Sequence, residues 1–468
     1  MRITAVNTAP VARGDYVLYW MIAARRTTWS FALDHAIATA TQLERPLLVF
    51  EPLRAGYPWA CDRFHAFVMQ GMADNAKRFA ARGITYLPYV EPAPGEGSGL
   101  LAALAARACC VVTDEQPGFF LPRMVAAAKR LPVRLEQVDG NGLLPLRATD
   151  RAFPTAMAFR RELQRKLPAH LQLPSADPLV RVPKIVRGAQ LPKLAWRTAT
   201  DLAALPIDHS VAPVAYRGGA VAATNLADEF FDDNLARYDA DRNDLDRDPA
   251  SGLSPYLHFG HISAHELVAR VWAEDEWTPE RLANAKVTGR RTGWWGLPSA
   301  SEAFLDQLVT WRELGYGFCF HEPKFGTWAS LPTWARTTLT ERAKDQRPEL
   351  YTRDQLERAD TADPIWNAAQ RQLLRDGRIH NYLRMLWGKK ILEWSPSPEA
   401  ALATLIELNN KYAVDGRDPN SYSGILWTLG MFDRPWGPKR PIFGTIRYMS
   451  SASTKRKFDL ASYLLRWA

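Results

Sequence analysis

The chain has 468 residues, of which 47% are hydrophobic and 23% charged, and its net charge at pH 7 is +9. This length exceeds what one hydrophobic core supports, so two or three domains are expected, and no run of about 18 uncharged apolar residues indicates a membrane span. The positive charge favours polyanionic partners. The N-terminus lacks the basic start and apolar core of a signal peptide, which predicts a cytoplasmic protein.

Four cysteines are present, and none forms a CxxC pair. Their spacing predicts neither a zinc site nor a disulfide framework, so buried thiols in a reducing compartment are expected. We accordingly expect no bound metal.

The first third of the chain alternates between two kinds of segment. Short, β-branched, apolar runs are typical of buried strands, and alanine-rich stretches between them have helical spacing. This alternation predicts a doubly wound parallel sheet, although no GxGxxG follows the first strand. The predicted strands are 15–21, 45–52, 83–90, 109–115 and 133–140, and the predicted helices are 31–43, 64–83 and 99–108.

A Pro-rich stretch without periodicity then predicts a long surface linker, and helical patterns follow it. The predicted fold is therefore an α/β domain over 1–170, a linker over 171–215 and an all-α domain over 216–468. The predicted helical segments are 223–243, 263–276, 300–316, 352–359, 363–377, 378–394 and 398–412.

Tryptophan is unusually frequent in the helical part, because 13 of the 17 tryptophans lie from Trp272 onward. A core rarely needs indoles at this density, whereas a stacking surface for a flat ligand or for bases would use them. In segment 378–394, Trp387 and Trp394 lie two helical turns apart, about 10 Å along the axis. A purely structural role for these indoles is the alternative.

Three further segments carry candidate functional residues. Ser251, Gly252 and Ser254 precede a short helix, where they predict either an anion site or an ordinary helix cap, with His258 packed in the core. Gln307 and Trp311 are spaced to share one helical face. Asn409 and Asn410 end a helix, and the turn after them places Asp415 where it could pair with Arg384.

Five ordered motifs make a family resemblance specific. They resemble the flavin domain of DNA photolyases, most closely the class II cyclobutane pyrimidine dimer photolyases, over nearly all of 220–460. A weaker resemblance extends into the N-terminal domain. The motifs are SGLSPYLHFGHIS at 251–263, DPIWNAAQ at 363–370, RIHNYLRMLWGKKILEW at 378–394, NKYAVDGRDPN at 410–420 and RPIFGTIRYM at 440–449.

The resemblance implies a U-shaped FAD in the helical domain, with an antenna chromophore, a deazaflavin or folate, as an open option. It implies a role for each matching residue. The residues implied to contact the FAD phosphates are Tyr238, Ser251, Leu253 and Ser254. Those implied to lie around the flavin ring are Asn381, Arg384 and Asp415, and Asn409 is implied to face N5 of the flavin. A tryptophan relay comprises Trp387, Trp366 and Trp394, and the lesion pocket comprises Gln307, Trp311, Met385 and Trp427.

Three departures from the family pattern lie near the lesion pocket or the relay. Gln307 replaces an active-site Glu, Leu386 stands where relatives often have Tyr, and the turn at 430–436 is one residue short. Gln can donate a hydrogen bond but cannot supply a proton.

The sequence therefore predicts a carbon–carbon lyase, a deoxyribodipyrimidine photolyase that repairs cyclobutane dimers in DNA by light-driven electron transfer. We expect a monomer. A blue-light photoreceptor without repair is the alternative that Gln307 favours, and a flavin-free nucleic-acid-binding scaffold is a third. The C-terminal basic residues would hold DNA phosphates, with Arg447 as the chosen example; the others are Arg434, Lys439, Arg440, Lys455, Arg456 and Lys457.

Overall fold

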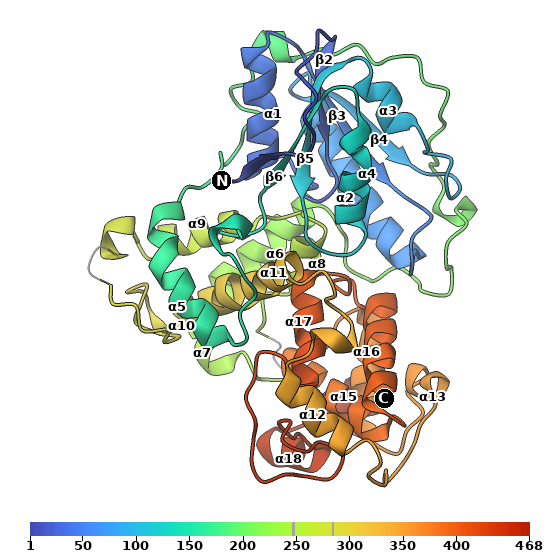
Figure 1. The fold of residues 1–468 in the computed structure, drawn as a ribbon, viewed down its shortest axis with the longest axis vertical. Helices are drawn as coiled ribbons and strands as arrows, with labels where there is room; N and C mark the ends of the chain where they lie inside the picture. Colours follow the sequence, from blue (N-terminus) through green and yellow to red (C-terminus); the bar gives the residue numbers. More distant parts are fainter. Residues whose placement is uncertain (246–248, 283–284) are drawn as a thin grey trace. The chain divides into compact units, whose positions relative to one another are not determined.

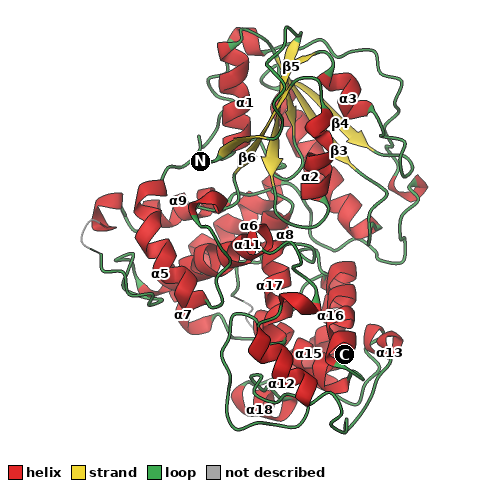
Figure 2. Cartoon of the chain, viewed as in Figure 1, coloured by secondary structure: helices red, strands yellow, loops and turns green. Residues whose placement is uncertain are grey.

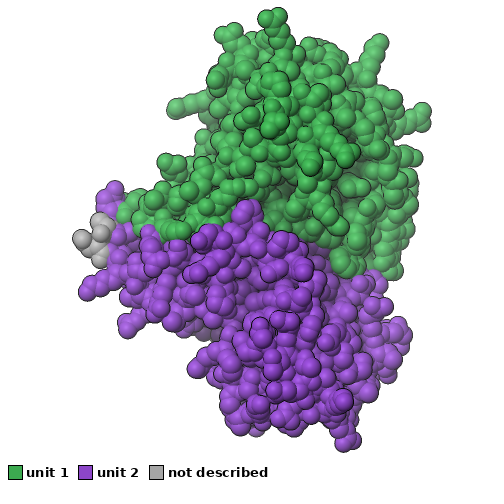
Figure 3. Space-filling model, viewed as in Figure 1, with its two compact units in different colours: residues 1–149, 166–229, 252–279 green, residues 150–165, 230–251, 280–468 purple. Residues whose placement is uncertain are grey.

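The computed structural model describes residues 1–245, 249–282 and 285–468 (Figure 1). The chain divides into two compact units, which are coloured separately in Figure 3. Unit 1 comprises 1–149, 166–229 and 252–279, and unit 2 comprises 150–165, 230–251 and 280–468. The units therefore differ from the predicted domains, because 252–279 is compact with the N-terminal part and 150–165 with the C-terminal part.

Unit 1 is built on one six-stranded sheet with the order β1-β6-β5-β2-β3-β4. All five predicted strands are present and pair in parallel. The additional strand β1 pairs antiparallel to β6 at the sheet edge. The strands are β1 (Ile3–Ala5), β2 (Tyr16–Trp20), β3 (Leu47–Leu53), β4 (Thr85–Val90), β5 (Ala108–Glu115) and β6 (Arg134–Asp139).

Helices cover both faces of this sheet (Figure 2), as the alternating pattern predicted. Successive residues of a strand point to opposite faces, so β2 contributes Leu18 to one hydrophobic cluster and Val17 to the other. Residues of α3 and α4 lie in the cluster of Leu18, and residues of α1 with Phe79 of α2 lie in the cluster of Val17. The helices are α1 (Phe31–Gln42), α2 (Asp62–Ala80), α3 (Leu100–Ala105) and α4 (Leu121–Ala127).

The predicted linker has no long helix or strand, and most of its residues are exposed, as expected for a segment on the surface. It contains short 3₁₀ turns at Lys184–Val186 and Leu202–Ala204. Val182, Val186 and Leu205 are buried in the hydrophobic clusters of unit 1. A few apolar side chains thus anchor this surface segment to the core of unit 1. Its sequence hides this role because its apolar residues have no regular spacing.

Three more helices begin in unit 1, namely α6 (Ala220–Asp233), α8 (Ser254–His258) and α9 (Ala264–Glu274). Within the described residues, unit 2 contains helices and no named strand. The predicted largely helical C-terminal region is therefore confirmed. The helices of unit 2 are α5 (Ala156–Lys166), α7 (Tyr238–Asp241), α10 (Ser299–Leu305), α11 (Arg312–His321), α12 (Thr333–Glu341), α13 (Arg353–Glu357), α14 (Pro364–Asp376), α15 (Asn381–Trp394), α16 (Pro398–Tyr412), α17 (Pro419–Thr428), α18 (Ser451–Lys457) and α19 (Ala461–Arg466).

The single helix predicted over 300–316 is interrupted. Between α10 and α11, Asp306–Trp311 forms a π-helix, in which the hydrogen bonds run from residue i to i+5. The carboxylate of Asp306 is buried and accepts a hydrogen bond of 2.8 Å from Nε of Arg160 on α5. This ion pair joins residues 146 positions apart, so local spacing could not reveal it.

None of the four cysteines forms a disulfide, and all four are buried, as predicted. Among the residues that the structure describes, no group of three or more His, Cys, Asp or Glu side chains is placed to hold a metal. In the same residues, no helix combines the length and the apolar character needed to cross a bilayer.

Asp114 at the end of β5 fixes the chain after β2. Its carboxylate accepts hydrogen bonds from the hydroxyl of Tyr19 and from the backbone N–H groups of Ile22, Ala23 and Ala24, at 2.8–3.0 Å. The residue is only 3% exposed. Four donors thus converge on one buried carboxylate at the carboxyl end of the central strands.

Asp114→Asn should lower the free energy of unfolding by roughly 2–4 kcal/mol. The asparagine amide has an N–H group where the aspartate has an oxygen, so some of the buried N–H and O–H donors around it would lose their acceptor. Urea unfolding measures this loss. Asp15→Asn is the control, because Asp15 pairs with Arg107 at an exposed site, and its effect should stay below about 0.5 kcal/mol. Equal losses at the two positions would contradict a structural role for the Asp114 contacts.

Candidate functional site

The start of α15 is fixed by His380, its N-cap. Nδ1 of His380 accepts a hydrogen bond from the N–H of Tyr382 at 3.3 Å, and Nε2 lies 3.2 Å from the carbonyl oxygen of Arg242. These contacts require the neutral tautomer with its proton on Nε2, since Nδ1 must accept while Nε2 donates. The cap thus fixes where α15 begins and ties its first turn to the carbonyl of Arg242.

Arg384, one turn into α15, lies at the centre of a polar network. Its guanidinium donates to Oγ of Ser421 at 2.8 Å and to Oδ1 of Asn409, and its Nη1 lies 3.3 Å from Oδ2 of Asp415. The expected ion pair between Asp415 and Arg384 is therefore present. The Arg384 and Asp415 side chains are 19% and 16% exposed, so this charge pair lies largely in the protein interior.

Asn409 is buried and fixed on all sides. Its Nδ2 donates to the carbonyl oxygen of Gly416 at 2.9 Å and to Oγ of Ser421 at 3.0 Å. Because Asn409 is on α16, Arg384 on α15 and Ser421 on α17, the network joins three helices. Ser421 was missed by sequence reasoning. Its position one turn beyond the Asp415 turn, in the first turn of a helix, was the available signal.

The predicted ring residue Asn381 lies in the first turn of α15, where it is exposed. Tyr238, predicted to contact phosphate, is the first residue of α7 and is 8% exposed, with its ring against Phe230 and Phe304. Burial raises the pKa of the Tyr238 phenol above its ordinary value. Ser251 is half-buried in a segment without regular structure. The structure thus brings Arg384, Asn409 and Asp415 together and gives no contact between them and Asn381.

Leu253 and Ser254 belong to unit 1 and are described with it. Leu253 is the N-cap of α8 and is buried, while Ser254, the first helical residue, is exposed. The N-cap position is thus occupied by Leu253 and not by a serine. His258 is half-buried, with its ring 4.5 Å from that of Phe259, in line with the packed role expected for it.

Three predicted relay tryptophans form one buried cluster in unit 2. The rings of Trp387 and Trp366 are parallel within 3° at 6.4 Å, and Trp366 meets Trp394 edge to face at 5.5 Å. Nε1 of Trp366 donates to the carbonyl oxygen of Trp387 at 3.0 Å. Trp366 of α14 therefore contacts both tryptophans of α15. None of the three is more than 3% exposed.

Two partners of this cluster were not predicted. Gln370, one turn after Trp366, accepts a hydrogen bond from Nε1 of Trp387 at 2.9 Å. Tyr351 lies edge-on to Trp394 with ring centroids 5.1 Å apart. Spacing of four residues on α14 was a signal for Gln370, whereas nothing local marked Tyr351.

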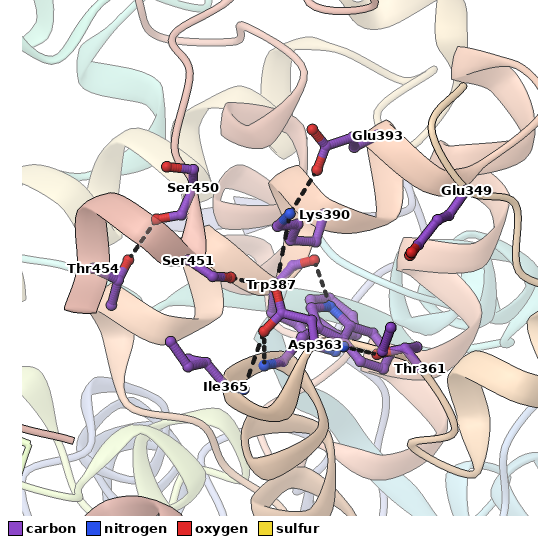
Figure 4. Close-up of polar contacts among 12 residues, drawn as sticks. Glu349, Thr361, Asp363, Ile365, Trp387, Lys390, Glu393, Ser450, Ser451 and Thr454 are labelled. Carbon is purple, nitrogen blue, oxygen red and sulfur yellow. Dashed lines mark hydrogen bonds and ion pairs between the residues drawn. The ribbon is translucent and has the colours of Figure 1, made fainter. Parts of the chain in front are cut away.

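A paired lysine lies beside the same cluster. Nζ of Lys390 is 2.8 Å from a Glu393 oxygen and 3.7 Å from an Asp363 oxygen, and it stands 5.1 Å from the ring centre of Trp394. Figure 4 shows this ammonium group between the two carboxylates. Asp363 also accepts from the N–H groups of Ile365 and Trp366 at the start of α14. This charge is therefore neutralised locally.

Two of the predicted lesion residues lie on the π-helix. Gln307 and Trp311 are both half-buried, and no side-chain hydrogen bond within the described residues engages the Gln307 amide. π-helical turns occur frequently at functional sites, because the inserted residue redirects the side chains around it. The ion pair of Asp306 with Arg160 holds this turn in place.

Trp427, the second aromatic residue predicted for the lesion pocket, lies near the end of α17 with cations over its ring. Nζ of Lys389 is 4.8 Å and Cζ of Arg447 is 5.8 Å from its centroid. Arg447 also stands 4.2 Å from the ring centre of Trp436. Met385, half-buried on α15, has its Cε 3.9 Å from the position that a Cβ on Gly424 of α17 would occupy. The remaining predicted phosphate-binding cations are exposed: Arg434, Lys439, Arg440, Lys455, Arg456 and Lys457.

The donor set of the three-helix network suits a flavin ring. Such a ring presents carbonyl oxygens and ring nitrogens that accept hydrogen bonds and an N–H that donates one, and its chemistry is tuned by nearby charge. A guanidinium, a carboxylate and an amide are the groups that these atoms need. The predicted FAD is therefore compatible with the residues present.

No protein-family model matches the chain. Three curated relatives, each called deoxyribodipyrimidine photo-lyase, match nearly its whole length. The relative from Methanothermobacter thermautotrophicus is 33% identical over 98% of this chain and 95% of its own. The rice relative is 34% identical over 99% of this chain and 89% of its own. The Potorous tridactylus relative is 32% identical over 95% of this chain and 80% of its own.

Two solved structures share the fold at low identity. A class III photolyase from Agrobacterium tumefaciens gives a TM-score of 0.70 at 17% identity, covering 98% of this chain and 88% of its own. A Synechocystis cryptochrome gives a TM-score of 0.70 at 16% identity, covering 97% of this chain and 88% of its own. With this fold, and with relatives above 30% identity along almost its entire length, the chain belongs to the DNA photolyase/cryptochrome family, as its motifs predicted.

Proposed function

We propose that this protein is a photolyase that repairs cyclobutane pyrimidine dimers in DNA under blue light, using FAD. One observation carries the proposal, namely the full-length match at 33–34% identity to proteins called deoxyribodipyrimidine photo-lyase. The polar network, the tryptophan cluster and the cation-lined Trp427 give it a physical basis. When bound, reduced FAD supplies the light-driven electron chemistry, and the protein supplies position and electrostatics.

The network of Arg384, Asp415 and Asn409 would hold the flavin ring, with Asn409 at N5 and Asn381 at the ring edge. Because Asn409 and Ser421 already hold the guanidinium, the ring would meet groups that need not reorganise. Preorganised donors of this kind stabilise developing charge at little cost. By the family resemblance, phosphate contacts are proposed for Tyr238 and Ser251 of unit 2 and, separately, for Leu253 and Ser254 of unit 1.

The three buried indoles provide a path for electrons. With Trp366 in contact with both Trp387 and Trp394, an electron can move between neighbouring rings over centroid distances of 5.5–6.4 Å. The hydrogen bond from Trp387 to Gln370 keeps that indole in its rotamer. These residues would serve to return the cofactor to its reduced form.

Substrate recognition would use the aromatic residues near the basic C-terminal segment. A dimer must leave the base stack, and damaged pairs unstack at lower cost than sound ones. Trp311 and Trp427 would stack on the extruded dimer, with Met385 beside it and Gln307 donating to its carbonyls. Arg447 and the exposed cations would neutralise phosphates. Duplex DNA containing such dimers is the proposed partner of a monomeric, cytoplasmic enzyme.

A photoreceptor with the same flavin and relay but no repair is the second candidate, and Gln307 is the observation that favours it. An amide cannot supply a proton as the family's carboxyl group can. Whether the α/β domain also holds a deazaflavin or folate antenna is a separate proposal, which the absorption spectrum of the purified protein would test.

The relay yields a first functional prediction. Trp387→Phe keeps an aromatic ring that is harder to oxidise, so the variant should retain FAD but photoreduce it at least about tenfold more slowly. Absorbance under blue light with a reductant measures this rate. Chemically reduced variant should repair DNA normally. Trp272→Phe, in a separate stacked indole pair, is the control, and a wild-type rate in Trp387→Phe would refute the relay.

Gln307 yields the prediction that tests the proposed function. If its amide donates a hydrogen bond to the dimer, the repair yield should not rise or fall with pH because of this residue, since the amide is neutral at every accessible pH. Gln307→Glu should be tolerated. Gln307→Leu should lower the repair yield, since losing a pocket donor costs on the order of a few kcal/mol of transition-state stabilisation.

The measurement is dimers repaired per absorbed photon for the three proteins with fully reduced FAD. If wild type and Gln307→Leu are both inactive while Gln307→Glu repairs, the native protein is a photoreceptor. Equal yields in all three would show that Gln307 does not touch the lesion.

A further inference from the structure

Among the residues that the structure describes, no carboxylate forms an ion pair with the buried ammonium group of Lys389. Lys389 lies on α15, two residues after Trp387, and it is 0% exposed. Nζ donates one hydrogen bond, of 2.7 Å, to the carbonyl oxygen of Thr428 at the end of α17. Buried charges are normally paired, because an isolated ion loses its hydration. The neighbouring Lys390 follows that rule, with Glu393 at 2.8 Å. Lys389 does not.

The second contact of this ammonium is the ring of Trp427, whose centroid is 4.8 Å away. At the same level, α15 and α17 meet closely, because a Cβ on Gly388 would lie 2.5 Å from Cγ2 of Thr428. Lys389 thus holds both the last carbonyl of α17 and the indole one residue before it. Trp427 is half-buried, whereas the Lys389 ammonium is shielded from water. Cation–π contacts are stronger when the cation is desolvated.

We propose that Lys389 is a positioning residue, whose buried ammonium fixes the Trp427 indole in the orientation in which it receives the DNA lesion. The role rests on the proposed function, since it takes Trp427 to contact the dimer. Lys389 itself does not touch the substrate. It acts through the ring and through the end of α17.

The charge on Lys389 depends on pH in the physiological range. Burial lowers the pKa of its ammonium from the ordinary 10.5 to about 7; Asp433 acts to raise this pKa and Arg447 to lower it. Both groups come from the segment after α17, and Arg447 also stands over Trp427. Below pH 7 the cation holds the indole, and above pH 7 the neutral amine loses that attraction.

This charge should cost stability. Between pH 7 and 10.5 the unfolded chain binds the proton that the folded chain releases, so the penalty is complete below pH 7 and fades as the pH rises through that window. Lys389→Met should therefore be at least as stable as wild type at pH 6. A lysine kept only for structure would give the opposite result.

The direct test follows the indole ¹H–¹⁵N signal of Trp427 by nuclear magnetic resonance between pH 5.5 and 8.5. Trp427→Phe assigns the signal. In wild type it should shift with a midpoint near pH 7. The Trp427 signal should not shift with pH in Lys389→Met. It should also not shift in Lys389→Gln, a variant that keeps a hydrogen-bond donor for the Thr428 carbonyl but carries no charge. The matched control is Lys390→Met, which should titrate as wild type does.

A second readout is the affinity of chemically reduced protein for dimer-containing duplex. At pH 6, Lys389→Met should bind roughly tenfold more weakly than wild type, with an unchanged repair yield once DNA is saturating. At pH 8 the difference in affinity between Lys389→Met and wild type should be smaller.

A Trp427 signal that is flat in wild type, or that still titrates in both Lys389 variants, would overturn the proposal. If the signal behaves as expected but no variant prefers damaged DNA, the positioning of Trp427 stands and the proposed substrate fails.

Discussion

The burial of one guanidinium is the constraint on which the helical site depends. Arg384 carries five N–H donors, and a largely buried charge of this kind must be both neutralised and hydrogen-bonded. Asp415, Asn409 and Ser421 meet that need, and each comes from a different part of the chain after α15. The helices α15, α16 and α17 can therefore pack only in the arrangement that completes this network, and that arrangement also sets where the aromatic residues of α15 and α17 lie.

Helix α15 distributes different tasks along its length. Its first turns carry the polar groups proposed for the flavin, its middle carries Trp387 within the indole cluster, and the next residues carry two lysines with opposite surroundings. Lys390 lies between carboxylates, whereas Lys389 contacts a carbonyl oxygen and an indole ring and, among the described residues, forms no ion pair. Electrostatics thus differ sharply between adjacent residues, because successive side chains of a helix point about 100° apart. Under the proposed function, this one helix would contribute residues to the flavin site, to the tryptophan relay and to the substrate side.

Much of this was predictable from local pattern. The five parallel strands have continuous apolar runs, and helices such as α14, α15 and α16 have clear periodicity, so these elements were found. The helices α5, α12, α17, α18 and α19 were not predicted. Strand β1 was missed because it has three residues and lies at an edge. The π-helix was missed because local spacing does not reveal it. Its buried Asp306 pairs with Arg160, which is distant in the sequence. Motif resemblance led to Arg384, Asp415 and the three tryptophans, but Ser421, Gln370 and Tyr351 acquire their partners only through tertiary packing.

The central claim is that this fold, with this network and an amide at position 307, repairs DNA with light. Its most direct test is the loss of cyclobutane dimers from duplex DNA incubated with the purified wild-type protein, fully reduced, under blue light and in darkness. The account predicts that dimers disappear only in the light, from protein whose absorption spectrum shows a bound flavin. Flavin-containing protein that leaves the dimers intact in blue light would contradict it.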